Sequence, residues 1–226
     1  NFAAEQSYLQ GMSAFWAGLT TTGITQINPG EIYLTGNNPN LNIFTLSAAD
    51  ILQDIGFHIN VPVGATTLAN ISGQSAQMKN FGFYFNQLDA NHDPQGLFPD
   101  SLILYNFFEA TALTIAGIEV HGSILAPWAD VDFSNGHIEG GLIASSLYGT
   151  GEAHNELFNG RLPVRPVPEP ATVILLGGGS DRPCGVPRAK EGIDRIRSAI
   201  LIGMPGAGKG AMAVLPAKRL GLALPN

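Results

Sequence analysis

The chain has 226 residues, of which 13% are charged and 45% are hydrophobic, and it contains 28 glycines. Globular chains average about 25% charged residues and about 7% glycine, so this composition disfavours a helical bundle, whose wet faces need Glu and Lys, while the apolar content disfavours a disordered chain. The net charge of −7 is divided unevenly, with a net of −12 over residues 1–170 and +5 over residues 171–226.

The two parts of the chain therefore differ in composition, and we expect a domain boundary between residues 165 and 180. We interpret residues 1–165 as a folded domain, 166–180 as a Pro- and Gly-rich linker, and 181–226 as a basic, poorly ordered tail. Phosphates would be repelled by the acidic body, so we expect no nucleic-acid partner. The Gly-rich, charge-poor body is typical of a mainly β protein with many turns.

The first predicted element is a helix over residues 2–19. Leu9, Met12, Trp16 and Leu19 follow the helical period, which predicts an apolar stripe packed on something larger. Gly23 is expected to end this helix.

Short strands are predicted next, because apolar or alternating segments are separated by clusters of Asn, Pro and Gly. The segments are residues 31–35, 42–46, 56–61 and 66–71. Between the second and third, Ser47 and Asp50 have the spacing of a helix N-cap with a capping box.

A near-repeat lies further along the chain. Residues 120–126 match residues 138–144 with a constant offset of 18, so that Val120 corresponds to Ile138 and Gly122 to Gly140. A repeat of this length favours one coil of a β-solenoid, in which inward apolar residues stack from coil to coil. On this pattern alone, a β-sandwich remains the alternative.

One segment has the spacing of a calcium loop. Asp89, Asn91 and Asp93 alternate as calcium ligands do, but Pro94 stands where such loops need glycine. A solvated acidic turn is the alternative interpretation. Calcium is the one cofactor that this pattern suggests, and no other is expected.

Histidines and acids offer two further candidates. His121, His137 and His154 are spaced by 16 and 17 residues, close to the coil length, so they could meet on stacked coils and bind zinc or simply form hydrogen bonds. Glu152 and His154 would face the same side of a strand. Since there is no Gly-x-Ser-x-Gly motif, we interpret them as a structural pair and expect no catalytic residues.

Several ordered blocks carry a family resemblance. Residues 122–131, 136–140 and 151–155 resemble the C-terminal signature of the choice-of-anchor A family, and the similarity spans residues 1–163. The resemblance implies an exported bacterial surface adhesin with a right-handed β-helix flanked by an α-helix, similar to ice-binding-type domains. Domains of that family begin before the helix, so we expect the N-terminal part of the domain to be missing.

The next block, Val167, Pro168, Glu169 and Pro170 followed by an apolar run, resembles the PEP-CTERM sorting signal of Gram-negative-type bacteria. The resemblance implies export and contact with a sorting and processing machinery. The apolar run at 171–176 would span about 9 Å as a helix, against about 30 Å of bilayer hydrocarbon. We therefore expect no complete membrane anchor in this chain.

The last segment, residues 195–226, resembles the P-loop opening of adenylate kinases. Gly203 and Gly208 would let backbone N–H groups surround phosphates, and Lys209 would reach their charge. Ala211 stands where the family has a threonine that serves the magnesium site. We interpret the segment as a truncated P-loop, and nucleotide binding is the alternative function.

The sequence thus predicts a non-enzymatic, exported adhesive domain. Its expected partners are extracellular matrix, polysaccharide or another cell-surface ligand at the outer surface of the bacterium. Carbohydrate binding or ice binding by the solenoid is a further alternative.

A melting experiment tests the P-loop interpretation. Because a truncated P-loop lacks the rest of a nucleotide site, millimolar Mg-ATP is expected to leave the Tm of the full chain unchanged. A rise of several degrees that disappears in Lys209→Ala would show that the tail binds nucleotide.

Overall fold

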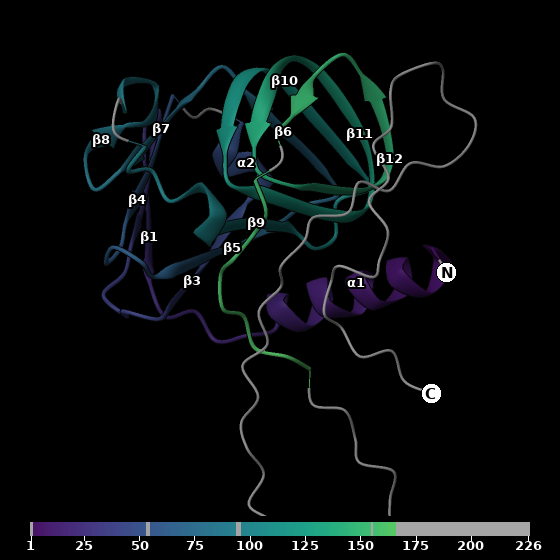
Figure 1. Cartoon of the computed structure of the whole chain (residues 1–226), viewed down its shortest axis with the longest axis horizontal. Coiled ribbons are helices and arrows are strands. Elements are labelled where there is room, and N and C mark those ends of the chain that lie inside the picture. The colour runs from purple at the N-terminus through teal and green to yellow at the C-terminus, as the bar shows by residue number, and fades with distance from the viewer. Residues whose placement is uncertain (1, 53–54, 94–95, 155, 166–226) are drawn as a thin grey trace, which may run out of the picture.

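The computed structural model describes residues 2–52, 55–93, 96–154 and 156–165 (Figure 1). Its elements in chain order are α1 (Phe2–Ala17), β1 (Ile24–Asn28), β2 (Glu31–Thr35), β3 (Leu41–Ser47), α2 (Ala48–Ile51), β4 (Gly56–Asn60), β5 (Thr66–Ser72), β6 (Ser75–Lys79), β7 (Gly82–Phe85), β8 (Leu88–Asp89), the 3-10 turns η1 (Ala90–His92) and η2 (Asp100–Leu102), β9 (Ile103–Phe107), β10 (Ala112–His121), β11 (Ser123–Glu139), β12 (Leu142–Gly149) and β13 (Glu152–Ala153). None of the helices in this described part has the length and apolar character needed to cross a bilayer.

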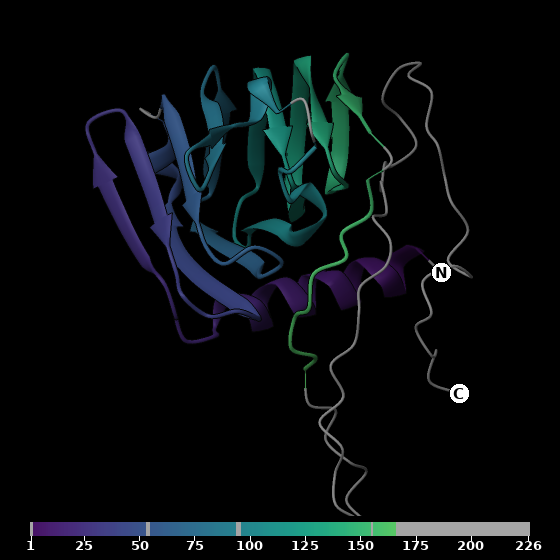
Figure 2. The ribbon, with the colours of Figure 1, turned by 60° about the vertical axis from the view of Figure 1, so that its left-hand side comes forward.

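The strands form two sheets in which pairing is mostly parallel. The first has the order β1-β2-β4-β7-β8, and only its two outermost pairs are antiparallel. The second has the order β3-β5-β9-β11-β10-β6, with β12 and β13 also paired to β11. The long strand β11 pairs with β9 near its start and with β10 along its later part, so this sheet curls around the core (Figure 2). A mainly β fold with an N-terminal helix is confirmed.

The 18-residue repeat predicted from the sequence is the register of neighbouring strands. Val120 in β10 lies opposite Ile138 in β11, and Ile124 in β11 lies opposite Leu142 in β12, all buried in one core. The chain turns between strands at Gly140. Here two backbones approach so closely that a Cβ would collide with the carbonyl oxygen of Gly122, the residue before β11. Parallel stacking with this offset rules out the β-sandwich alternative, which requires antiparallel sheets.

The predicted strands at 31–35, 42–46, 56–61 and 66–71 are confirmed as β2 to β5, with ends that differ by one residue at most. The capping box is confirmed too. The hydroxyl of Ser47 accepts from the amide of Asp50, and the Asp50 carboxylate accepts from the Ser47 amide, so both ends of this link are satisfied. The turn that it starts, α2, is short and packs against β6 and β3.

The N-terminal helix α1 is confirmed, but its predicted end at Gly23 is wrong. The helix ends at Ala17, and the amide of Gly18 bonds back to the carbonyls of the last turn. The amides of Thr22 and Gly23 both donate to the carbonyl of Ile43 in β3. The backbone of residues 22–23 is therefore held by the sheet and is not available to continue a helix.

Helix α1 covers the outer face of the second sheet (Figure 2). Its Met12 and Trp16 are buried against a row of apolar residues that the sheet presents outward, which confirms the predicted apolar stripe. The row consists of Ile43, Leu68, Leu104, Leu125 and Ile143. Because each comes from a different turn of the chain, the helix joins successive strands together.

Two asparagines fix the helix on this apolar face. Asn106 is fully buried; its amide donates to the carbonyl of Ser13 and to Asn70 Oδ1, and its oxygen accepts from the Ser13 hydroxyl. Asn70 donates to the carbonyl of Trp16. All these groups lie away from water, so each depends on the others for its hydrogen bonds.

Replacing Asn106 tests this network. Asn106→Ala leaves three buried polar partners without their bond to Asn106. Because each unsatisfied buried group costs about 1–3 kcal/mol, we expect the free energy of unfolding to fall by at least about 3 kcal/mol in urea titration. The control is Asn37→Ala, an exposed loop position expected to change stability by less than about 0.5 kcal/mol. Equal effects of the two variants would contradict the role of the buried network.

Candidate functional site

Three short sequence triplets build a cluster of acids and histidines on the second sheet. They are residues 119–121 at the end of β10, 137–139 at the end of β11, and 152–154 at and after β13. Each triplet carries a glutamate at one end and a histidine at the other. Because alternate residues of a strand face opposite sides, both ends face away from the core that holds the middle residues Val120 and Ile138, although His121 is itself enclosed by its neighbours.

The parallel register sets each histidine opposite a carboxylate. Glu119 lies opposite His137, His121 lies opposite Glu139, and His137 lies opposite Glu152 on its other side. Such directly opposed, oppositely charged pairs stabilise adjacent strands when the histidine is protonated. The order of glutamate and histidine reverses in the middle triplet. Because of this reversal, carboxylates and imidazoles alternate from one strand to the next.

The imidazole of His137 is the centre of the cluster. Its Nε2 lies 3.0 Å from Glu119 Oε1 and 3.5 Å from Glu139 Oε1. The ring stacks on that of His154, with centroids 4.9 Å apart, and His154 Nδ1 lies 2.7 Å from the same Glu139 oxygen. The prediction that histidines 16 and 17 residues apart would come together on neighbouring strands is confirmed for this pair.

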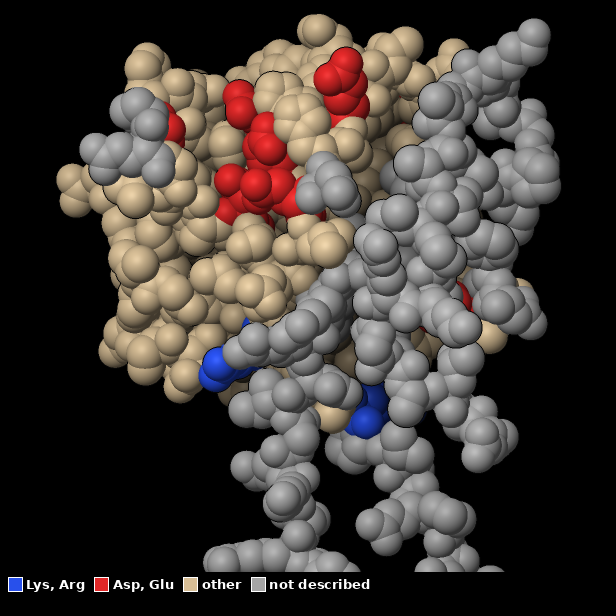
Figure 3. Space-filling model, in the orientation of Figure 1, with Lys and Arg blue, Asp and Glu red and all other residues tan. Residues whose placement is uncertain are grey.

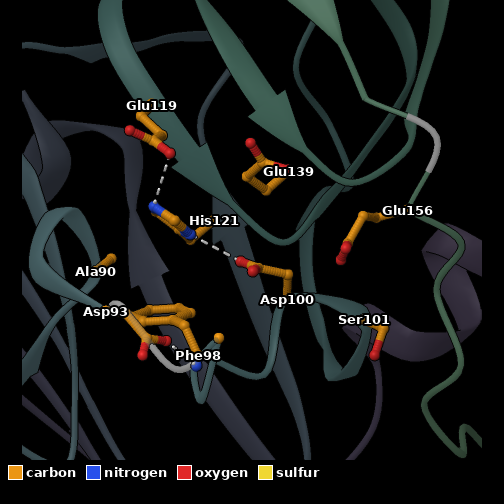
Figure 4. Close-up of a pocket in the computed structure, with 10 residues that line it drawn as sticks. Ala90, Asp93, Phe98, Asp100, Ser101, Glu119, His121, Glu139 and Glu156 are labelled. Atoms are coloured by element: carbon orange, nitrogen blue, oxygen red, sulfur yellow. Dashed lines mark hydrogen bonds and ion pairs between the residues drawn. The ribbon is translucent and has the colours of Figure 1, made fainter.

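His121 occupies a more enclosed position. Its side chain is 7% exposed, and its ring lies against Phe98, with centroids 4.6 Å apart. Nδ1 lies 2.9 Å from Oδ1 of Asp100, which comes from η2. Nε2 has no hydrogen-bond partner and lies 3.6 Å from Glu119 Oε1. Figure 4 shows this ring between the two carboxylates.

These side chains line a pocket of about 410 Å³. The lining residues are Ala90, Asp93, Gly96, Phe98, Asp100, Ser101, Glu119, His121, Glu139 and Glu156. They include five carboxylates, and no Lys or Arg is among the described residues of the lining. Figure 3 shows the acidic side chains gathered on this face of the molecule.

The pocket disfavours the charged form of two of its acids. Burial raises the pKa of Asp100, although the hydrogen bond from His121 opposes the effect. Partial withdrawal from water raises the pKa of Glu156, and the negative charges of Asp100 and Glu139 add to the rise. An acid whose folded-state pKa is raised contributes stability at low pH that is lost as the pH rises through that pKa.

The predicted calcium loop is found with its carboxylates already engaged. Asp89 caps η1 by accepting from the amide of Asn91, 3.0 Å away, and also lies 2.9 Å from His92 Nδ1. Asp93 accepts from the amide of Phe98 and faces the pocket. Calcium binding by Asp89, Asn91 and Asp93 stays a prediction.

The histidine spacing did not predict Glu119 and Glu139 as residues of the site. The signal that would have found them is the 18-residue offset, which maps one triplet onto the next with glutamate and histidine exchanged. Glu152 was expected to pair with His154, and the two lie 4.0 Å apart. The predicted sorting residues Val167, Pro168, Glu169 and Pro170 and the P-loop residues Gly203, Gly208 and Lys209 lie outside the described residues.

The parallel stacked strands with one covering helix define a mainly β domain. Residues 1–155 match the family described as "Putative Ice-binding-like adhesive domain", and the chain belongs to this family. No curated protein and no solved structure gives a match. The adhesive and ice-binding-like part of the sequence-based prediction is thereby confirmed, whereas the narrower choice-of-anchor A and PEP-CTERM assignments are not shown by this match.

Neutralising one acid of the pocket tests its electrostatics. Because the folded state disfavours the ionised form of Glu156, Glu156→Gln is expected to raise the Tm at pH 7 and low salt. The difference from the parent chain should shrink at pH 3.5, where the glutamate is protonated both folded and unfolded, and with 0.5 M NaCl. An equal or lower Tm at pH 7 would contradict the charge repulsion described above.

Proposed function

We propose that the chain is an exported bacterial surface protein whose body is a non-catalytic adhesive domain. The single observation that carries this proposal is the match of residues 1–155 to an adhesive domain family. The parallel stacking of successive strands, with an offset of 18 residues between β10 and β11 and at the start of the β11–β12 pair, supports a right-handed β-helix, as the choice-of-anchor A resemblance implies. Such a body is rigid and offers flat outer faces to a ligand.

We also propose that residues 167–170 act as a sorting signal that delivers the domain to the outer surface or extracellular matrix of a Gram-negative-type bacterium. The Pro-Glu-Pro sequence ahead of an apolar run supports this role. The domain organisation follows from it, with the adhesive body at 1–165, the linker at 166–180 and a basic tail at 181–226. We assign no nucleotide chemistry to Lys209.

The outer face of the first sheet is the ligand face that we favour. Toward the core this sheet places a row of buried residues, such as Phe57 and Phe83, in register. Toward the outside it places Tyr33, His58 and Tyr84 in a second row, whose rings stack with successive centroids 4.4 Å apart. This row is partly exposed.

The stacked rings are held in place by their neighbours. The carboxylate of Glu31 pairs with His58 Nε2, which holds the middle ring between the two tyrosines. Beside the ring row, Thr35 lies opposite Asn60 on the adjacent strand, so polar side chains border the aromatic one. Aromatic edges beside hydroxyl and amide groups suit a sugar polymer, which offers both apolar ring faces and hydroxyls.

The net negative charge of the body indicates which class of polysaccharide it can bind. Residues 1–170 carry fifteen acidic and three basic side chains, so an anionic polysaccharide would be repelled from this body at low salt. We therefore propose a neutral polysaccharide as the ligand. We do not favour ice binding, because the outer row of this sheet combines aromatic rings with asparagine and has no sustained threonine array.

Adsorption to insoluble polymers tests the proposal. The purified full chain is incubated with cellulose, chitin and curdlan particles and with alginate beads, and the free protein is measured after centrifugation. We expect saturable retention by at least one neutral polymer and none by alginate at low salt. Tyr33→Ala combined with Tyr84→Ala should lower retention at least tenfold.

The matched control is Tyr148→Ala, because Tyr148 is a tyrosine in β12 of the second sheet with 69% of its surface exposed. This variant should bind as the parent chain does. Retention by none of the three neutral polymers, or an equal loss in the Tyr148 variant, would contradict the proposed ligand face.

A further inference from the structure

We infer that Glu119, His137 and Glu139 form a binding site for one divalent transition-metal ion of the zinc type, with His121 Nε2 close by, 3.6 Å from Glu119 Oε1. No ligand chemistry is assigned to this cluster by the adhesive role, and the site lies on the second sheet, away from the ring row of the first. One nitrogen and two carboxylate oxygens from the first three residues lie within 4.8 Å of one another. They come from the two adjacent strands β10 and β11.

The spacing of the ligand atoms fits a metal of this size. Zinc binds histidine nitrogen and carboxylate oxygen at about 2.0–2.2 Å, so ligand atoms at tetrahedral corners stand about 3.3–3.5 Å apart. His137 Nε2 lies 3.0 Å from Glu119 Oε1 and 3.5 Å from Glu139 Oε1. Small side-chain rotations would place one ion among the three atoms without moving the strands.

His121 provides an independent indication that a ligand belongs here. Its imidazole is 93% buried, yet Nε2 has no hydrogen-bond partner, which is rare for a buried polar atom. Nδ1 lies 2.9 Å from Asp100 Oδ1, and a proton on Nδ1 donated to this carboxylate leaves a free electron pair on Nε2. That nitrogen lies 3.6 Å from Glu119 Oε1, on the side of the pocket (Figure 4).

The residues around the candidate ligands resemble those around metals in other proteins, where each ligand side chain is hydrogen-bonded to a further group. Ligating histidines normally donate their second nitrogen to a carboxylate, as His121 does to Asp100 in this geometry. His154 Nδ1 lies 2.7 Å from Glu139 Oε1 and orients that carboxylate in turn. Around the pocket five carboxylates attract a cation, and no described Lys or Arg of the lining competes with it.

The mixed donor set selects the class of metal. Imidazole nitrogen suits zinc and its neighbours among the transition metals, whereas calcium takes six to eight oxygen ligands and magnesium keeps most of its waters. One imidazole and two carboxylates, with a second imidazole beside Glu119, therefore favour zinc over either alkaline-earth ion. The predicted calcium loop at Asp89 is a separate feature, since its carboxylates bond to backbone amides.

Isothermal titration calorimetry with metal-freed full chain tests the site. Every protein carries Cys184→Ser, because the single thiol is itself a zinc ligand. Zinc chloride at pH 7.5 should bind with one-to-one stoichiometry at this cluster, whereas calcium and magnesium chloride at the same concentration should give no heat that His137→Gln removes. His137→Gln and Glu119→Gln should each weaken zinc binding at least tenfold.

The matched control is His92→Gln, an exposed histidine with 83% of its side chain in water that stands outside the cluster. It should bind zinc as the parent does. If His137→Gln fails to fold by circular dichroism, Glu119→Gln decides the result. The inference is overturned if zinc does not saturate, if both cluster variants bind as the parent does, or if the His92 variant loses as much. Polysaccharide plays no part in this titration, so its outcome is independent of the adhesion experiment.

Discussion

The parallel register between successive turns of the chain is the constraint on which the rest of the structure depends. β10 pairs with β11 at an offset of 18 residues, and β11 begins its pairing with β12 at the same offset, so Val120 meets Ile138 and Ile124 meets Leu142. A slip of one residue would exchange the inward and outward faces of a strand. It would bury the charged triplet 137–139 and expose the apolar core.

The same register explains why the acids and histidines form a cluster. Residues far apart in the chain, such as Glu119 and His137, become direct neighbours only because their strands pair in this one alignment. The outer face of the second sheet shows the complementary case. Where α1 lies, the outward residues of this sheet are apolar, so the helix covers them, and buried Asn70 and Asn106 bind it in one position. A repeating core thus supports an acidic face and a helix-covered face.

Local features of the fold could be predicted from the sequence, because their causes are local. The strand at 31–35 and the capping box at Ser47 follow from alternation, turn residues and a side chain three positions away. The end of α1 could not be predicted, since hydrogen bonds from residues 22–23 to β3 determine where the chain leaves the helix. The pairing of β11 with both β9 and β10 likewise depends on strands outside its own segment.

The candidate site was predictable only in part for the same reason. Histidine spacing indicated that side chains would meet, but the glutamates between them acquire meaning only when the register is known. At the Asp89 loop, the spacing that predicts calcium ligands also places Asp89 to accept a hydrogen bond from the amide of Asn91, so spacing alone does not separate the two roles. One measurement tests the account most directly: an anomalous difference map, recorded above the zinc absorption edge, from crystals of the full chain soaked in zinc. We expect a peak within about 2.2 Å of His137 Nε2, between the carboxylates of Glu119 and Glu139 on strands in the 18-residue register. A map with no peak there, or strands paired in another register, would contradict the account.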